Sequence, residues 1–196
     1  MRFKLLAVVV SVLVLVIAGP LAARVKVQSD FDKTFDFSAL KTFTWPSDGF
    51  GQVKMAITKD DDPEALRRRF EPVIVAAVEA NLTGRGYVKA KPGEAANFTM
   101  AYFGLVSTNQ QAQTMGQFLP GTVSWGLPPF LATTTSLKIF EQGSIVLDVR
   151  RPDTNVVWRG VAQAEMHCDR PDAERNKRTA DVVNEILKQF PPKKKK

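Results

Sequence analysis

Residues 143–166 contain the pattern that most restricts the fold, because two runs of alternating side chains stand on either side of a turn. In the first run, Ile145, Leu147 and Val149 alternate with Asp148 and Arg150. A second alternation follows the turn-forming segment 151–155 and runs from Val156 through Trp158 to Ala164. A period of two is typical of half-buried strands, and Pro, Asp and Asn favour a tight turn. The segment therefore predicts a β-hairpin with an apolar face and a polar face that carries Asp148, Arg150, Arg159, Gln163 and Glu165.

Two helices are predicted around this hairpin. The first begins at the acidic run 60–62, where an Asp caps the helix and Pro63 takes the first helical position, and it ends at Gly84 or Gly86. Pro72 predicts a kink or a restart within it. The second helix opens at 170–172 and stops before the prolines at 191–192.

The remaining alternating runs predict strands at 24–32, 41–45, 97–107 and 137–140, with a brief one at 87–91. The fold class is therefore α+β. We expect a mostly antiparallel sheet of about five or six strands with two main helices packed on one face, in the order β-β-α-β-β-β-α.

The N-terminal residues 1–23 are typical of a secretory signal. Two basic residues, Arg2 and Lys4, precede an apolar stretch, and small residues follow at 22–23. Cleavage after Ala23 is one interpretation, and an uncleaved membrane anchor is the other, since the apolar stretch approaches the ~20 residues that span a bilayer. In both cases the chain is exported to the periplasm or cell envelope.

The charge of the chain argues against nucleic-acid binding. The formal net charge of +7 falls to +5 without Arg2 and Lys4, and the basic tail 193–196 supplies four of those charges. The body, residues 24–192, is then nearly neutral, whereas a nucleic-acid-binding domain carries its basic patch on the fold. The length of this body predicts a single domain, and the tail has the charge that anionic phospholipid attracts.

No charged residue occurs between Ala95 and Leu137. Within this stretch we expect a long uncharged loop at 108–136, which is rich in Gln, Thr, Gly and Pro. Its large apolar side chains indicate contact with a membrane interface or a protein groove, and the alternative is a flap or an additional hairpin folded over the sheet. The residues proposed for partner or membrane contact are Phe118, Trp125 and Phe130.

Motifs for cofactors and metals are weak. Gly49 and Gly51 lack the lysine and helix start of a phosphate loop, so a plain loop is predicted there. The acids at 60–62 lack the spacing of a calcium loop. Cys168 and His167 are neighbours that point to opposite faces of an extended segment. The sequence predicts no catalytic, cofactor or metal residues.

One enzymatic alternative remains, a hydrolase with a carboxylate pair. Asp148 and Glu165 lie on the same predicted hairpin and face the same side, as general acid/base catalysis requires. The simpler interpretation is a solvated strand face on which Arg150 and Arg159 balance these charges. A third hypothesis is a domain that self-associates through an open sheet edge or through a hydrophobic flap.

Several short motifs follow one another in a recognisable order. They are Asp30-Phe31-Asp32, Phe37-Ser38, Thr42-Phe43-Thr44-Trp45, Gly86-Tyr87, Gly143-Ser144-Ile145-Val146-Leu147-Asp148, Val157-Trp158-Arg159-Gly160 and Phe190-Pro191. Over residues 24–192 this order resembles the bacterial envelope family called domain of unknown function 4136. The resemblance implies a secreted α+β domain, often a lipoprotein, without established activity. Many such proteins carry a lipid-modified cysteine at the end of the signal, and this chain has none there.

Taken together, the sequence predicts a non-enzymatic envelope domain that binds another envelope component or a small ligand. The expected partner is an envelope protein or a membrane surface.

Overall fold

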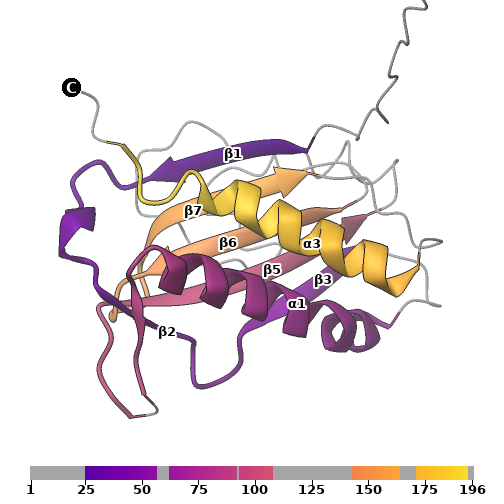
Figure 1. The fold of residues 1–196 in the computed structure, drawn as a ribbon, viewed down its shortest axis with the longest axis horizontal. Helices are drawn as coiled ribbons and strands as arrows, with labels where there is room; N and C mark the ends of the chain where they lie inside the picture. Colours follow the sequence, from indigo (N-terminus) through magenta and orange to yellow (C-terminus); the bar gives the residue numbers. More distant parts are fainter. Residues whose placement is uncertain (1–24, 57–61, 92, 108–142, 164–170, 194–196) are drawn as a thin grey trace, which may run out of the picture.

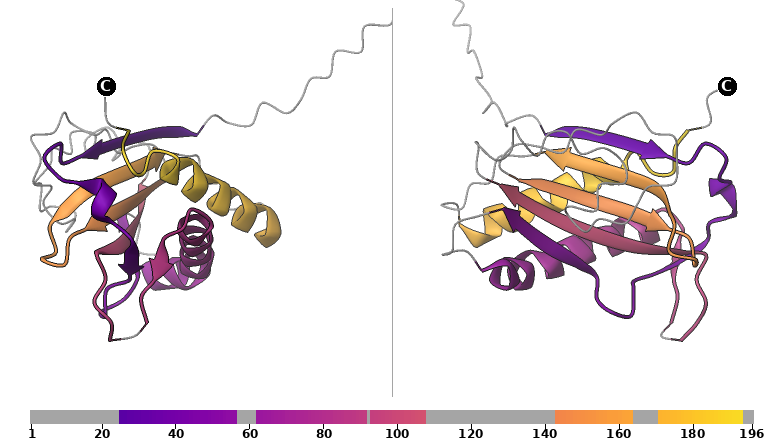
Figure 2. Two further views of the ribbon diagram at one scale, coloured as in Figure 1. Left: turned by 60° about the vertical axis from the view of Figure 1, so that its left-hand side comes forward. Right: turned by 180° about the vertical axis from the view of Figure 1, so that it is seen from behind.

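The computed structural model describes residues 25–56, 62–91, 93–107, 143–163 and 171–193. These residues form a seven-stranded sheet and two long helices, α1 and α3, so the predicted α+β class is confirmed. Both helices cover the same face of the sheet (Figure 1). Seen from behind, the opposite face has neither helix in front of it (Figure 2).

The sheet is mixed rather than mostly antiparallel. Its strands are β1 (Lys26–Phe31), β2 (Thr42–Thr44), β3 (Gly51–Ala56), β4 (Val88–Lys89), β5 (Phe98–Ser107), β6 (Ser144–Arg150) and β7 (Val156–Gln163). The order is β1-β7-β6-β5-β2-β4. Strand β3 also pairs with β5, at residues 102–107, whereas β2 pairs with residues 98–99 of the same strand. The pairs β1–β7, β7–β6 and β6–β5 are antiparallel, whereas β5–β3, β5–β2 and β2–β4 are parallel. Helix α1 explains the parallel half, because it forms the crossover between strands that run in the same direction.

Strand β3 replaces the end of the predicted glycine loop. It begins at Gly51, where a Cβ atom would lie 2.2 Å from the backbone oxygen of Tyr102. Only glycine permits this approach of two backbones, so the residue that resembled part of a phosphate loop has a packing role. The predicted strand at 137–140 lies outside the described residues.

Helix α1 (Pro63–Gly84) begins as predicted. Asp62 is the N-cap and its side chain accepts a hydrogen bond from the backbone N–H of Glu64 at 2.9 Å. The helix runs through Pro72 without a restart. It ends at Gly84, and Gly86 then takes a φ of +88°, a backbone conformation that glycine adopts readily.

Helix α3 (Asp172–Leu187) lies beside α1, and Arg85 connects the C-terminal ends of the two helices. The Arg85 guanidinium donates to the backbone oxygen of Leu187 at 2.9 Å and to that of Phe190. Leu187 is the last residue of α3, and its oxygen also accepts from the backbone N–H of Phe190 at 3.0 Å, whereas Phe190 lies beyond the helix. Carbonyl groups at a helix C-terminus lack the usual intrahelical donor and take such partners. One side chain at the end of α1 therefore fixes the end of α3.

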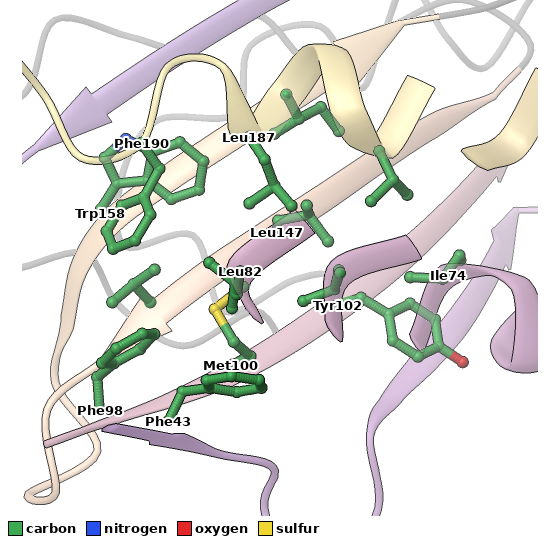
Figure 3. Packing of buried hydrophobic residues seen from close by; sticks show 14 of the residues in the cluster. Phe43, Ile74, Leu82, Phe98, Met100, Tyr102, Leu147, Trp158, Leu187 and Phe190 are labelled. Carbon is green, nitrogen blue, oxygen red and sulfur yellow. The ribbon is translucent and has the colours of Figure 1, made fainter. Parts of the chain in front are cut away.

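The core lies between the helices and the sheet (Figure 3). Alternate residues of β5 and β6 face the helices, and they meet apolar residues of α1 and α3. Fully buried members of this cluster are Phe43, Val78, Leu82, Met100, Tyr102, Leu147, Val149, Trp158, Val183, Ile186, Leu187 and Phe190. Trp158 is therefore a core residue.

Candidate functional site: a charged cluster on the helix-free face of the sheet

The register of the sheet brings three charged residues of the family motifs into one row. Arg159 of β7 stands opposite Asp148 of β6 on one side and opposite Asp30 of β1 on the other. Paired residues on neighbouring strands point to the same face. This face is the helix-free one, because Leu147 and Trp158, next to Asp148 and Arg159 in the chain, belong to the core.

Asp148 and Arg159 form a bidentate ion pair. The Nε and Nη2 atoms of Arg159 donate to the two carboxylate oxygens of Asp148 at 2.7 and 2.8 Å. Asp148 is completely buried and Arg159 is 6% exposed. The prediction of a solvated polar face is therefore wrong for these residues. The planar guanidinium fork matches both carboxylate oxygens and so compensates for the loss of water around each charge.

Arg150 is the second cation of this charged cluster, which we define as Asp148, Arg150 and Arg159. Its Nη2 atom lies 3.9 Å from an oxygen of Asp148, too far for a hydrogen bond. The guanidinium lies over the ring of Phe103, 5.6 Å from its centre. Burial lowers the pKa of Arg150, although the charge of Asp148 opposes that change. The cluster thus holds two cations and one anion.

Apolar side chains surround the charged cluster on the same face. They are Ala101, Phe103, Val146 and Val161, and all four are buried. Charges in such surroundings interact strongly with one another and with any polar group brought near them. The arrangement suits the binding of a charged group better than it suits proton transfer, since both oxygens of Asp148 already accept hydrogen bonds.

The proposed carboxylate pair is not assembled within the described residues. Asp148 is held by Arg159, and Glu165 lies outside the residues that the structure describes. Cys168 and His167 also lie outside them. Within the described ranges, no group of three or more His, Cys, Asp or Glu side chains is placed to hold a metal ion.

The proposed contact residues Phe118, Trp125 and Phe130 lie outside the described residues, as do the N-terminal segment 1–23 and most of the basic tail. Lys193, the one described residue of that tail, is exposed. Among the described residues, neither α1 nor α3 contains a stretch long and apolar enough to cross a bilayer.

Sequence reasoning missed a polar contact inside the core. The hydroxyl of Tyr102 donates to Glu71 of α1 at 2.8 Å, and Glu71 also accepts from Arg67 at 3.1 Å. Burial, followed by the hydrogen bond to Glu71, raises the pKa of Tyr102. The spacing of Arg67 and Glu71 by four residues indicates their pairing on a helix, but nothing in the sequence indicates that Tyr102 meets them.

The aromatic residues of the family motifs meet around Phe190. Its ring centre lies 6.2 Å from that of Phe37, 5.9 Å from that of Tyr87 and 5.3 Å from that of Trp158. These residues come from the segment after β1, the end of α1 and strand β7. The motifs therefore serve two purposes, since their aromatic members build the core and their charged members build the helix-free face.

The chain is similar in fold to solved structures of proteins from two other organisms. A DUF4136 family protein from Bacteroides thetaiotaomicron matches with a TM-score of 0.50 at 16% identity, over 85% of this chain and 96% of that one. A PDZ domain protein from Parabacteroides distasonis matches with a TM-score of 0.50 at 12% identity, over 88% of this chain but 37% of that one. At these identities the likeness concerns the fold alone.

No curated protein matches this chain. The family model described as domain of unknown function DUF4136 matches residues 27–192, which is most of the chain and includes the charged cluster and the aromatic residues around Phe190. The chain therefore belongs to the DUF4136 family.

Proposed function

We propose that this protein is exported and acts as a non-enzymatic binding domain of the bacterial cell envelope. The observation that carries the proposal is the charged cluster, in which a buried Asp148–Arg159 ion pair lies beside the mostly buried Arg150 on a face that neither helix covers. A buried charge that is not fully paired is costly, and a bound partner of opposite charge reduces that cost. The signal-like segment 1–23 supports export.

The ion pair between Asp148 and Arg159 counts against the hydrolase with a carboxylate pair. A general base needs a free oxygen within reach of the proton that it removes. Both oxygens of Asp148 accept hydrogen bonds from Arg159, and the residue is fully buried. We therefore favour binding over acid/base chemistry at this position.

Cell fractionation with intact-mass measurement tests the proposed location. A mass that begins at Arg24 in the soluble envelope fraction is expected for a cleaved signal, and a full-length mass in the membrane fraction is expected for an anchor. Either result supports export. Recovery of the full-length chain in the cytosol would contradict the proposal.

The same fractionation tests the proposed contact residues. If Phe118, Trp125 and Phe130 contact the membrane or a membrane protein, replacing all three by Ser moves mature protein from the membrane fraction to the soluble one, because the apolar contact is lost. The matched control replaces Gln110, Gln111 and Gln113, polar residues of the same uncharged segment, by Ser. An unchanged distribution of the triple variant would exclude these side chains as the contact.

A further inference from the structure

Arg150 has a charge that its neighbours leave unmatched. Asp148 is the only carboxylate within 4.0 Å of Arg150 among the described residues, and it accepts its short hydrogen bonds from Arg159. Asp30 stands opposite Arg159 on β1, two strands away from Arg150. Asp48 attracts Arg150 only at longer range. The second positive charge of the cluster therefore has no close anion of its own within the part of the chain that is described.

The guanidinium of Arg150 also has hydrogen-bonding capacity to spare. Its side chain is 17% exposed, and its buried Nε atom has no hydrogen-bond partner among the described residues. A guanidinium offers five N–H donors in a fixed plane, a geometry that matches two oxygens of a carboxylate or phosphate group. The ring of Phe103 supports one face of that plane. Arg150 is thus held in place with donors available to an oxyanion.

Two threonines lie in one row with Arg150 across neighbouring strands. Thr99 of β5 stands opposite Arg150, and Thr44 of β2 stands opposite Thr99. Both are partly exposed, whereas Ala101 and Phe103 farther along β5 are buried. A threonine hydroxyl donates one hydrogen bond. The Thr44 hydroxyl donates to the backbone oxygen of Trp45 at 3.4 Å, so Thr99 is the threonine whose hydroxyl can donate to a ligand.

The sequence limits what else could neutralise Arg150. From Ala95 to Leu137 there is no Asp or Glu, so neither β5 nor the long uncharged segment after it supplies a carboxylate. An external anion therefore competes for Arg150 with Asp148 and, at longer range, with Asp48, but with no carboxylate from this part of the chain.

We propose that Arg150, together with the hydroxyl of Thr99, binds an oxyanion of the ligand, a carboxylate or phosphate group. This inference rests on the proposed binding function and names the chemical class of ligand. Arg159 has a positioning role, since it holds Asp148 and so leaves Arg150 available. Phosphate and carboxylate groups both match the donors of this site. Titration with inorganic phosphate and with acetate distinguishes which of the two the ligand carries.

The test uses isothermal titration calorimetry. The purified chain is titrated with inorganic phosphate and, in a separate experiment, with acetate. Sodium chloride at the same ionic strength is the reference. We expect saturable binding of at least one anion, and the anion that binds more tightly indicates which oxyanion the ligand carries. Arg150→Gln is expected to raise the Kd by about tenfold or more, because a charge-assisted hydrogen-bonded contact is lost.

The matched control is Arg151→Gln. Arg151 is the next residue, but its side chain is 45% exposed and pairs with Asp153 at 2.8 Å, so the Kd of this variant is expected to equal that of the wild type. Thr99→Val keeps the shape of the side chain and is expected to raise the Kd by about threefold, which gives a second measurement if Arg150→Gln does not fold.

Two results would overturn the inference. One is the absence of saturable binding of both anions by the wild-type chain. The other is the same affinity in wild type, Arg150→Gln and Thr99→Val. Neither result bears on export, which the fractionation measures independently, so failure of this site and failure of the proposed function are distinguishable.

Discussion

Asp30 shows how one side chain of the helix-free face sets a pH dependence. One of its carboxylate oxygens accepts a hydrogen bond from the backbone N–H of Phe31 at 2.8 Å. The other is buried and has no hydrogen-bond partner among the described residues. Burial raises the pKa of Asp30, and the Phe31 N–H and the charge of Lys33 only partly oppose this. Relative to the unfolded chain, folding therefore shifts Asp30 toward its protonated form.

A raised carboxyl pKa fixes the sign of the effect on stability. The stabilising contribution of protonated Asp30 is complete below the unfolded value of 3.8 and is lost as the pH rises through the higher folded pKa. At neutral pH the charge of Asp30 therefore costs stability. Asn keeps the acceptor for Phe31 and removes the charge, so we expect Asp30→Asn to have a higher free energy of unfolding than the wild type at pH 7.

Urea denaturation between pH 4 and pH 8 checks this expectation. The difference between Asp30→Asn and wild type should shrink as the pH falls toward 4, because the wild type then becomes neutral too. Asp181→Asn is the control, since Asp181 is 61% exposed and pairs with Lys177 on the surface of α3, where an ion pair contributes little. A less stable Asp30→Asn variant at pH 7 would contradict the argument.

At the scale of elements, the contact between β7 and α3 depends on Gly160. A Cβ atom at this position would lie 2.4 Å from a methyl carbon of Ile186 and 2.4 Å from the ring of Trp158. Both neighbours are fully buried, so neither can move aside without disturbing the core. Gly160 therefore permits close packing of β7 against α3.

We expect Gly160→Ala to lower the free energy of unfolding by about 2 kcal/mol or more, since the added methyl group overpacks the core. Gly84→Ala is the matched control, because a Cβ atom at this position would meet no other part of the chain within 4 Å and alanine favours the helix. Its stability should equal or slightly exceed that of the wild type. Equal stability of the two variants in thermal or urea denaturation would show that β7 and α3 can separate at no cost.

Local signals in the sequence predict the elements better than their arrangement. The hairpin and the ends of both helices follow from alternation, capping residues and prolines, all of which act within a few residues. The short strands β3 and β4 pair with segments far away in the chain, and their own residues say little about that pairing. The parallel half of the sheet was therefore not predicted, because it depends on where α1 returns the chain.

The charged cluster could be predicted in composition but not in environment. Alternation places Asp148, Arg150 and Arg159 on one face, and opposite charges on neighbouring strands favour pairing. Whether such a face is wet or buried depends on what packs over it, which periodicity does not reveal. The inequality between the two arginines also depends on their distances to Asp148, 2.7 Å for Arg159 and 3.9 Å for Arg150, which only the three-dimensional structure provides.

At the scale of the whole molecule, Phe190 joins segments from both ends of the chain. Besides Phe37, Tyr87 and Trp158, its ring meets Phe98 of β5 with the centres 5.9 Å apart. Phe190 follows α3 and is completely buried, while Arg85 holds its backbone oxygen. A single residue near the C-terminus thus connects the N-terminal motif, the end of α1 and two central strands, and we infer that these parts unfold together.

Phe190→Ala tests this inference. Loss of a buried aromatic ring leaves a cavity, so we expect the free energy of unfolding to fall by about 3–5 kcal/mol. If the parts are coupled, tryptophan fluorescence, which includes Trp158 in the core, and far-UV circular dichroism, which follows the helices, give coincident urea transitions in the variant as in the wild type. The control Phe50→Ala removes a ring that is 37% exposed and contacts Trp45, for which about 1 kcal/mol is expected. Separate transitions for the two signals in Phe190→Ala would instead show that the helices unfold independently of the sheet, and the motifs that meet at Phe190 would then stabilise only its immediate surroundings.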